Sequence, residues 1–139
     1  MTHTRADYPL AETQPGAVKG KRGKSLAEIT LDSVLAGDVT MEDLRITPQA
    51  LQAQADVARD VGRPTLALNF ERGAELVEVP QDFIMQVYEL LRPGRAKSKE
   101  ELLEAAATIR DTYQAERIAR FIEEAAETYA ARGLFTFRF

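Results

Sequence analysis

The sequence predicts an all-α protein of several amphipathic helices with an extended, irregular N-terminal arm. First, apolar residues recur every three or four positions from residue 30 onward, as on one face of a helix. Second, threonine, serine and proline stand where helices would begin, and glycine stands where they would end. Third, residues 1–24 contain two prolines and three glycines, which favours an extended arm over a helix or a central strand. We therefore expect an arm over residues 1–24 and a single helical domain over residues 25–139.

The first helices are marked by capping residues. Thr30 can cap a short helix that Gly37 ends, and Thr40 begins another short helical turn. Thr47 and Pro48 together form a strong start signal, a capping hydroxyl followed by proline at the first helical position. This longer helix would run to about residue 61, where Gly62 ends it. Its inner face would carry Leu51, Ala55 and Ala58.

Prolines divide the middle of the chain. Arg63 and Pro64 begin a helix that Pro80 ends, and Pro80 also opens the next helix, which Pro93 and Gly94 stop. The apolar stripe of the first of these helices is Leu66, Phe70, Ala74 and Val77. The stripe of the second is Phe83, Ile84, Val87, Tyr88 and Leu91. Gly73 lies in mid-helix at a cost of roughly 1 kcal/mol relative to alanine, which a close contact at that position would explain.

After a polar linker over residues 94–99, Ser98 and Glu101 have the spacing of a capping box. The apolar positions that follow are Leu102, Ala106, Ile109 and Tyr113, then Ile118, Phe121, Ile122, Ala125 and Tyr129. They fit either one long helix or two, ending near Gly133. Phe135, Phe137 and Phe139 alternate with polar residues, as in an extended segment, and either pack back on the chain's own helices or bind a partner.

The composition excludes most catalytic chemistry. The chain has no cysteine, and its one histidine is His3, near a terminus. A Ser/His/Asp or Cys/His nucleophile and a Cys/His zinc site are therefore not expected. The abundant carboxylates read better as a solvated helix surface with ion pairs than as a di-metal site, which would need Glu-x-x-His pairs. We expect no catalytic, cofactor-binding or metal-binding residue in this chain.

Charge is uneven along the sequence. Residues 1–24 carry a net charge of +3 and the remainder carries −7. The basic stretch from Lys19 to Lys24 fits either nucleic-acid binding or a solvated arm that docks on an acidic partner. We prefer the second interpretation, because no aromatic residue interleaves with these lysines. Nucleic acid is therefore not an expected partner. A membrane is not expected either, because no apolar run approaches the roughly 20 residues of a membrane span.

Several blocks with distinctive composition follow one another along the chain. They are Asp7–Ala11, Leu44–Pro48, Asn69–Pro80, Tyr88–Pro93 and Lys99–Leu103. In content, order and spacing they resemble the small subunit of adenosylcobalamin-dependent diol dehydratase and glycerol dehydratase, over about residues 7–132. The resemblance leaves glycerol and propane-1,2-diol both open as substrates, since the family's substrate pocket lies in another subunit.

The resemblance implies a hetero-oligomer with two copies each of a large, a medium and a small subunit. In this family the large subunit encloses the substrate, and cobalamin lies between the large and medium subunits. Cleavage of its cobalt–carbon bond yields an adenosyl radical, which starts the conversion of the diol to an aldehyde and water. The small subunit supplies no catalytic residue, so the chain alone should be inactive. A reactivating factor is a further implied partner.

The resemblance also implies a bacterial cytoplasmic protein, with a microcompartment as the alternative location. Some small subunits carry long N-terminal extensions linked to packaging. Only six residues precede Asp7 here, so we expect any packaging to come from another subunit.

Six residues are candidates for an interface with partner subunits. Three arginines lie in the distinctive blocks, and arginine suits bidentate pairing at interfaces. Tyr8 and Pro9 form an apolar hook, and Phe70 lies beside one of the arginines in the densest block. The six are Tyr8, Pro9, Arg45, Phe70, Arg72 and Arg92. The alternatives are a cap over the chain's own core for the hook, an internal ion pair for Arg72, and helix-end charge satisfaction for Arg92.

Two other functions remain as alternatives to a dehydratase subunit. The first is a free-standing helical adaptor, which would be a stable monomer or homo-oligomer. The second is a nucleic-acid binder that uses the basic arm, against which the acidic remainder of the chain argues.

Overall fold

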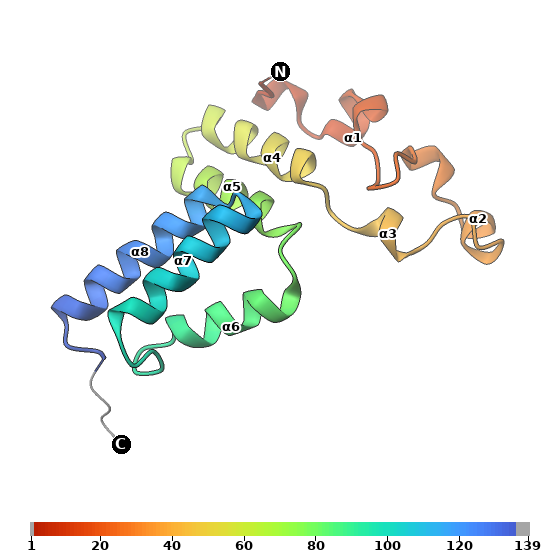
Figure 1. Cartoon of the computed structure of the whole chain (residues 1–139). Helices are drawn as coiled ribbons and strands as arrows, with labels where there is room; N and C mark the ends of the chain where they lie inside the picture. The colour runs from red at the N-terminus through yellow and green to blue at the C-terminus, as the bar shows by residue number, and fades with distance from the viewer. Residues whose placement is uncertain (1, 136–139) are drawn as a thin grey trace. The chain divides into compact units, whose positions relative to one another are not determined.

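The computed structural model describes residues 2–135, which form helices and their connections (Figure 1). Over these residues the only β-type pairing is an isolated antiparallel bridge between Lys19 and Ser25, so the all-α prediction is confirmed. The chain divides into two compact units, Met1–Val77 and Glu78–Phe139. The expectation of one domain over residues 25–139 stays a prediction.

The N-terminal arm is irregular, but short helical turns replace much of the extended chain that the sequence predicted. These turns are the 3₁₀ helices Arg5–Asp7 and Pro15–Ala17 and the α-helix α1, Leu10–Thr13. The first is capped locally, since the Thr4 N–H donates to Asp7 Oδ2 at 2.8 Å. Such side-chain bonds let a segment rich in proline and glycine curl without forming a long helix.

The next two helices are very short and begin where predicted, and the first also ends at the predicted glycine. Helix α2 is Leu31–Leu35, and Thr30 Oγ1 caps it by accepting the Ser33 N–H at 3.2 Å. Gly37 follows with a φ of +80°, a left-handed conformation that favours glycine. Helix α3 is Met41–Leu44, and the Thr40 N–H donates to Asp43 Oδ2 at 2.9 Å. A 3₁₀ turn, Leu26–Glu28, precedes α2.

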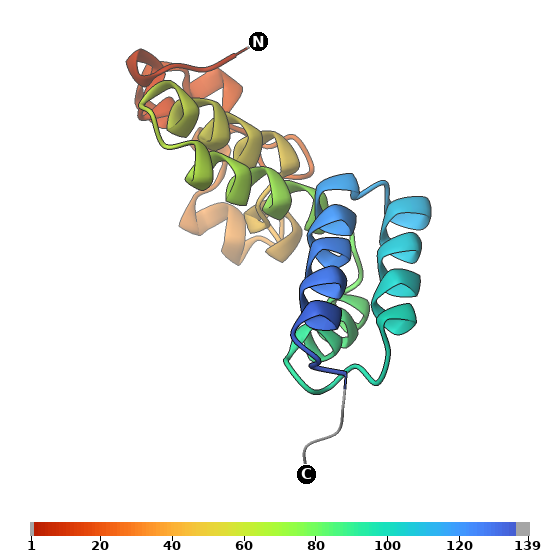
Figure 2. The same cartoon turned by 90° about the vertical axis from the view of Figure 1, so that its left-hand side faces the viewer.

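Helices α4, Pro48–Asp60, and α5, Pro64–Leu76, pack side by side (Figure 2). Thr47 Oγ1 caps α4 as predicted by accepting the Ala50 N–H at 3.2 Å. The cluster between the two helices consists of Ala55, Ala58 and Ala67, with Phe70 packed against it. Small side chains let the two backbones approach closely.

On the inner face of α4, Ala55 and Ala58 are buried as predicted, but Leu51 is only partly buried and the buried Ala53 was not predicted. The predicted stripe of α5 was also partly wrong. Leu66 is exposed, whereas Ala67 and Glu71 are buried. The Glu71 carboxylate is paired with Arg59 of α4 at 2.6 Å, which offsets the cost of burying it. The stripe was placed on the larger side chains, although the face toward α4 needs small ones.

The second unit contains α6, Gln81–Leu91, α7, Lys99–Tyr113, and α8, Glu116–Ala131. The question of one C-terminal helix or two is settled as two, which pack against each other (Figure 2). Gln114 separates them with a φ of +55°, a left-handed conformation uncommon outside glycine. Their shared core contains Leu102, Ala105, Ala106, Ile109, Ile118, Ala119, Ile122 and Ala126.

Three details of the second unit differ from the sequence prediction. Tyr88 and Phe121, both placed on apolar faces, are exposed. The capping box at α7 is half formed: Ser98 Oγ accepts the Glu101 N–H at 3.4 Å, but the Glu101 carboxylate accepts the N–H of Lys97 at 3.0 Å.

Aromatic residues connect different elements of the second unit. The rings of Phe83 and Tyr113 lie 5.7 Å apart, and the Tyr129 hydroxyl donates to the carbonyl of Leu91. Of the C-terminal phenylalanines, Phe135 packs edge-on against Tyr129 with ring centroids 6.3 Å apart. Phe137 and Phe139 lie outside the described residues.

Candidate functional site

The most unusual surface of the described chain is a short segment with many uncovered apolar side chains. Residues 26–46, here called the apolar segment, expose Leu26, Leu31, Val34, Leu35, Met41, Leu44 and Ile46. Leu31, Leu35 and Met41 are 73%, 77% and 72% exposed. Leu31, Val34 and Leu35 lie at positions i, i+3 and i+4 of α2, so they share one face of that helix.

The apolar segment does not use these side chains to build the chain's own core. Within the first unit the extensively packed helices are α4 and α5, and neither α2 nor α3 forms a comparable pair with another element. Figure 1 shows α2 and α3 standing away from the α4–α5 pair. An exposed apolar surface of this kind marks a site of interaction with another molecule.

An ion pair between a half-exposed arginine and a buried carboxylate joins the basic arm to the apolar segment. Asp43 is only 3% exposed. Arg22 donates from Nε to Asp43 Oδ1 at 2.9 Å, and its second terminal nitrogen donates to Asp43 Oδ2 and to the Asp38 carbonyl, the latter at 2.7 Å. The hydrogen bonds from Arg22 lower the pKa of Asp43 to about 2; the Thr40 N–H also lowers it, and burial opposes both. Arg22, a residue of the basic stretch, is therefore engaged within this chain.

The backbone of the arm also lies directly against α3. A Cβ placed on Gly20 would come within 2.4 Å of the Asp43 carbonyl oxygen, so this contact requires glycine. The Gly20 N–H donates to the Lys24 carbonyl at 2.9 Å, which folds residues 20–24 into a tight turn. The turn places Arg22 beside the Asp43 carboxylate.

A groove with a volume of about 1000 Å³ lies between the arm and helices α4 and α5. Its apolar lining includes Tyr8, Pro9, Val57, Leu66 and Phe70, and its basic lining includes Arg5, Lys19, Lys21 and Arg63. Two hydrogen bonds from backbone N–H groups of the arm to aspartate side chains of α4 hold the arm against this helix. The His3 N–H donates to Asp56 Oδ2 at 3.2 Å, and the Arg5 N–H donates to Asp60 Oδ2 at 2.9 Å.

The structure brings together three of the six residues predicted to form a partner interface. Tyr8, Pro9 and Phe70 all line the groove. The other three lie elsewhere. Arg45 is exposed in the apolar segment and pairs with Glu42 at 3.2 Å.

Arg72 and Arg92 also lie apart from the groove lining. Arg72 is partly buried on α5. Arg92 directly follows α6 in the second unit, where it pairs with Glu89 at 3.2 Å. The interface role of Arg92 and the alternative of helix-end charge satisfaction both stay predictions.

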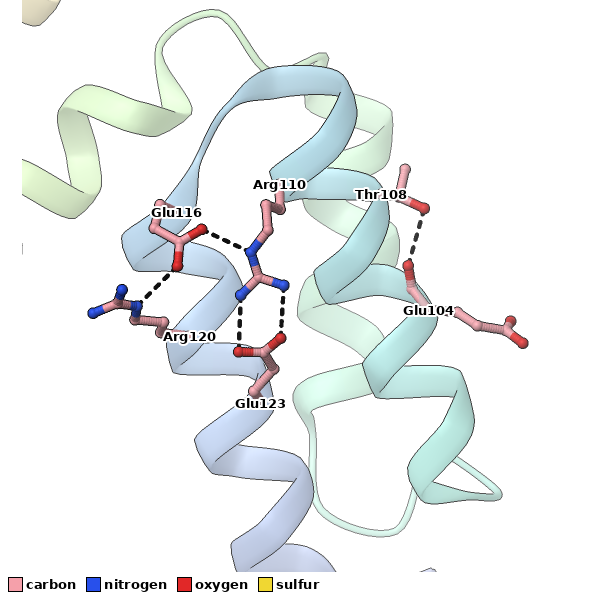
Figure 3. A network of polar contacts seen from close by, with 6 residues as sticks. All are labelled: Glu104, Thr108, Arg110, Glu116, Arg120 and Glu123. Atoms are coloured by element: carbon pink, nitrogen blue, oxygen red, sulfur yellow. Dashed lines mark hydrogen bonds and ion pairs between the residues drawn. The ribbon is translucent and has the colours of Figure 1, made fainter.

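A charged network links α7 and α8 (Figure 3). Arg110 donates from Nε to Glu116 at 2.7 Å and through both terminal nitrogens to Glu123 at 2.7 and 2.9 Å, and Arg120 donates to the other oxygen of Glu116 at 2.8 Å. The hydrogen bonds from Arg110 lower the pKa of Glu116 and of Glu123. Both carboxylates are thus held ionised by neighbouring cations, which suits a structural role. Near the network, Thr108 donates to the Glu104 carbonyl at 3.0 Å.

Residues 2–135 contain neither a metal-binding cluster of side chains nor a membrane-spanning helix. No group of three or more histidine, aspartate or glutamate side chains is arranged to hold a metal ion. Every helix in this part of the chain is too short or too polar to cross a lipid bilayer.

Comparison with known proteins identifies the family. The family model described as "Dehydratase small subunit" matches residues 3–136. The chain belongs to the dehydratase small-subunit family. Two propanediol dehydratase small subunits are similar to it. The one from Salmonella typhimurium strain LT2 is 49% identical over 127 residues, and the one from Citrobacter freundii is 48% identical over 126 residues. In both cases the match covers 91% of this chain and 73% of the relative.

The apolar segment of this dehydratase small-subunit chain was not identified from the sequence. The sequence predicts its helices, but the apolar pattern does not indicate whether their side chains are buried or exposed. A signal was present: a helix of five residues that carries Leu31, Val34 and Leu35 is too short to bury such a face against a second helix of its own chain.

Proposed function

We propose that this chain is the structural small subunit of a propanediol dehydratase, a hydro-lyase that converts a diol to an aldehyde and water. The identity of 49% to a propanediol dehydratase small subunit, over nine-tenths of this chain, carries the proposal. The internal pairing of the charged groups supports a structural role. Asp43, Glu71 and Glu123 each pair with an arginine of the same chain. These pairs join the arm to α3, α4 to α5, and α7 to α8.

We propose that the adenosylcobalamin implied by the family is held by the large and medium subunits. The family resemblance supports this proposal, because it implies that cobalamin lies between those two subunits. The one histidine, His3, lies on the arm, where its backbone N–H is bound to Asp56. We therefore assign no step of the radical reaction to this chain, and its contribution to activity is the assembly and solubility of the complex.

The proposed partners are the large and medium dehydratase subunits, with two copies of each subunit in the complex and a reactivating factor as a further partner. The bacterial cytoplasm is the proposed location, and a microcompartment is the alternative. The six residues first considered for the partner interface remain part of this proposal. The groove gives it a sharper form, since Tyr8, Pro9 and Phe70 lie around one cavity.

Tyr8 provides the cleaner test of the groove. One test of the interface is to replace both Phe70 and Arg72 by alanine. Phe70 also packs against the alanine cluster of α4 and α5, so this double variant would disturb the fold as well as the interface. Tyr8 is 70% exposed, so Tyr8→Ala should leave the isolated chain folded and weaken assembly if the groove is used. If both the Tyr8→Ala variant and the Phe70/Arg72 double variant assemble like the wild type, the groove is not part of the interface.

The decisive experiment is co-expression of the large and medium subunits of the same operon with and without this chain. The purified complex is assayed for aldehyde formation from propane-1,2-diol with adenosylcobalamin. We expect this chain to co-purify, and activity or solubility to fall without it. A fully active enzyme of two subunits that never binds this chain would contradict the proposal and favour a free-standing helical adaptor.

A further inference from the structure

We propose that the apolar segment, residues 26–46, is the surface through which this chain docks on another dehydratase subunit. The partner surface that fits it is an apolar depression bordered by lysine and arginine side chains. The inference rests on the proposed function, which supplies the partner. The structure supplies the surface and the chemistry that the partner must present.

The size and composition of the apolar segment suit a protein–protein interface. Seven large apolar side chains are exposed within its 21 residues, enough for the apolar centre of an interface that other residues complete. Leucine and methionine side chains that are more than two-thirds exposed can insert into a partner as the dry centre of the contact. Leu31 and Leu35 lie one turn apart on α2, so they would enter the partner together.

The charges of the apolar segment determine what kind of partner fits. Asp32 and Asp38 are exposed, whereas the cation of the segment, Arg45, is already paired with Glu42. Glu28 is exposed as well, but its carboxylate accepts the N–H and the hydroxyl of Ser25. This acidic border is complementary to a basic one. A second copy of the same surface would instead oppose carboxylates to carboxylates, which is unfavourable. The electrostatics therefore favour a different subunit over self-association.

The apolar segment is also held in place before binding. Thr30 and Ser33 cap α2, and Arg22 ties both the Asp38 carbonyl and the Asp43 carboxylate to the arm. A surface ordered in advance loses less conformational entropy when it binds. Capping and tethering thus present α2 and α3 in a fixed form, although neither helix pairs extensively with another helix in the first unit.

The test uses the complex of this chain with affinity-tagged large and medium subunits. The double variant Leu31→Asp/Leu35→Asp places two charges at the centre of the proposed contact. Burying one leucine typically changes affinity by a factor of roughly ten or more, so we expect at least about 100-fold weaker association of the double variant. The matched control is Met85→Asp on α6, another exposed apolar position, which should co-purify like the wild type.

A charge reversal tests the chemistry of the partner. Asp38→Lys should weaken association most at low ionic strength, whereas Asp111→Lys, an exposed position on α7, should not. Circular dichroism of each isolated variant verifies that α-helix is retained. If Leu31→Asp/Leu35→Asp co-purifies as well as the wild type, the inference is overturned while the proposed function stands. If the wild type fails to co-purify, the proposed function itself is wrong.

Discussion

The apolar segment and the α7–α8 pair contain similar residues and use them differently. Helices α7 and α8 have 15 and 16 residues and bury leucine, isoleucine and alanine against each other. Helices α2 and α3 have five and four residues and leave their leucines in solvent. Helix length makes the difference, because a stripe of four turns can cover another such stripe and a single turn cannot. Apolar periodicity alone therefore does not distinguish a core from a docking surface.

The polar contacts of the two regions differ in the same way. In α7–α8 the network around Arg110 supplements an apolar core. In the apolar segment the pair of Arg22 and Asp43, with the close approach of Gly20, is the main link to the arm. We therefore expect α7–α8 to be sensitive to loss of apolar volume, and the apolar segment to be sensitive to changes at the contact of Arg22 and Gly20 with Asp43.

The largest contrast should come from removing apolar volume in both regions. Ile122 is fully buried in α8, so Ile122→Ala should lower the free energy of unfolding by about 2–5 kcal/mol. Leu35→Ala removes a similar side chain from a solvent-exposed site and should change the free energy of unfolding by less than about 0.5 kcal/mol. Denaturant unfolding followed by circular dichroism measures both. Equal destabilisation would mean that the apolar segment is packed in the isolated chain after all.

A methyl group at the contact of Gly20 with Asp43 should have a smaller effect. In Gly20→Ala the new Cβ would meet the Asp43 carbonyl oxygen, so the turn of residues 20–24 must move away from α3. Overpacking of this kind costs about 1–3 kcal/mol. Gly16→Ala is the control, because a Cβ there meets no atom within 4 Å.

Limited trypsin digestion reads out the state of this turn, which contains Lys21, Arg22 and Lys24. Cleavage should be faster in Gly20→Ala than in Gly16→Ala or the wild type. Identical cleavage of all three proteins would show that the arm does not depend on this contact.

Acid should loosen the apolar segment before it disrupts the apolar core of α7–α8. The pKa of Asp43 is lowered from 3.8 to about 2 in the folded chain. Its pairing with Arg22 therefore stabilises the fold fully above about pH 4, and this stabilisation is lost as the pH falls through about 2. NMR titration of the Asp43 carboxyl carbon, with hydrogen exchange of residues 26–46, measures the effect. The Asp43→Asn variant should lack this pH dependence. A titration midpoint of the Asp43 carboxyl near pH 3.8 in the wild type would contradict the prediction.

Much of the fold could be predicted because capping is local. The hydroxyls of Thr30, Thr47 and Ser98 each begin a helix at the predicted position. The break between α7 and α8 could not be placed, because Gln114 adopts a left-handed conformation without being glycine. The stripe of α5 was misjudged for a different reason, since close approach to α4 favours Ala67 over the larger Leu66.

The candidate site was harder to predict than the fold. The grouping of Tyr8, Pro9 and Phe70 joins residues about 60 positions apart, and the pairing of Arg22 with Asp43 spans 21 positions. Neither has a periodic signature, because both depend on where the arm folds. The blocks that identified the family carried information on membership but not on which faces remain uncovered.

The smallest expected effect on stability concerns the packing between α4 and α5. Gly73 was expected to mark a close contact, but a Cβ there would meet only Leu51 Cδ1 at 3.7 Å, an ordinary van der Waals distance. Gly73→Ala should therefore raise the free energy of unfolding by about 0.5–1 kcal/mol, since alanine loses less entropy in a helix. Gly37→Ala is the control; Gly37 has a φ of +80°, so alanine there should destabilise the chain. If Gly73→Ala is also destabilising, α4 and α5 are packed more tightly than this distance indicates.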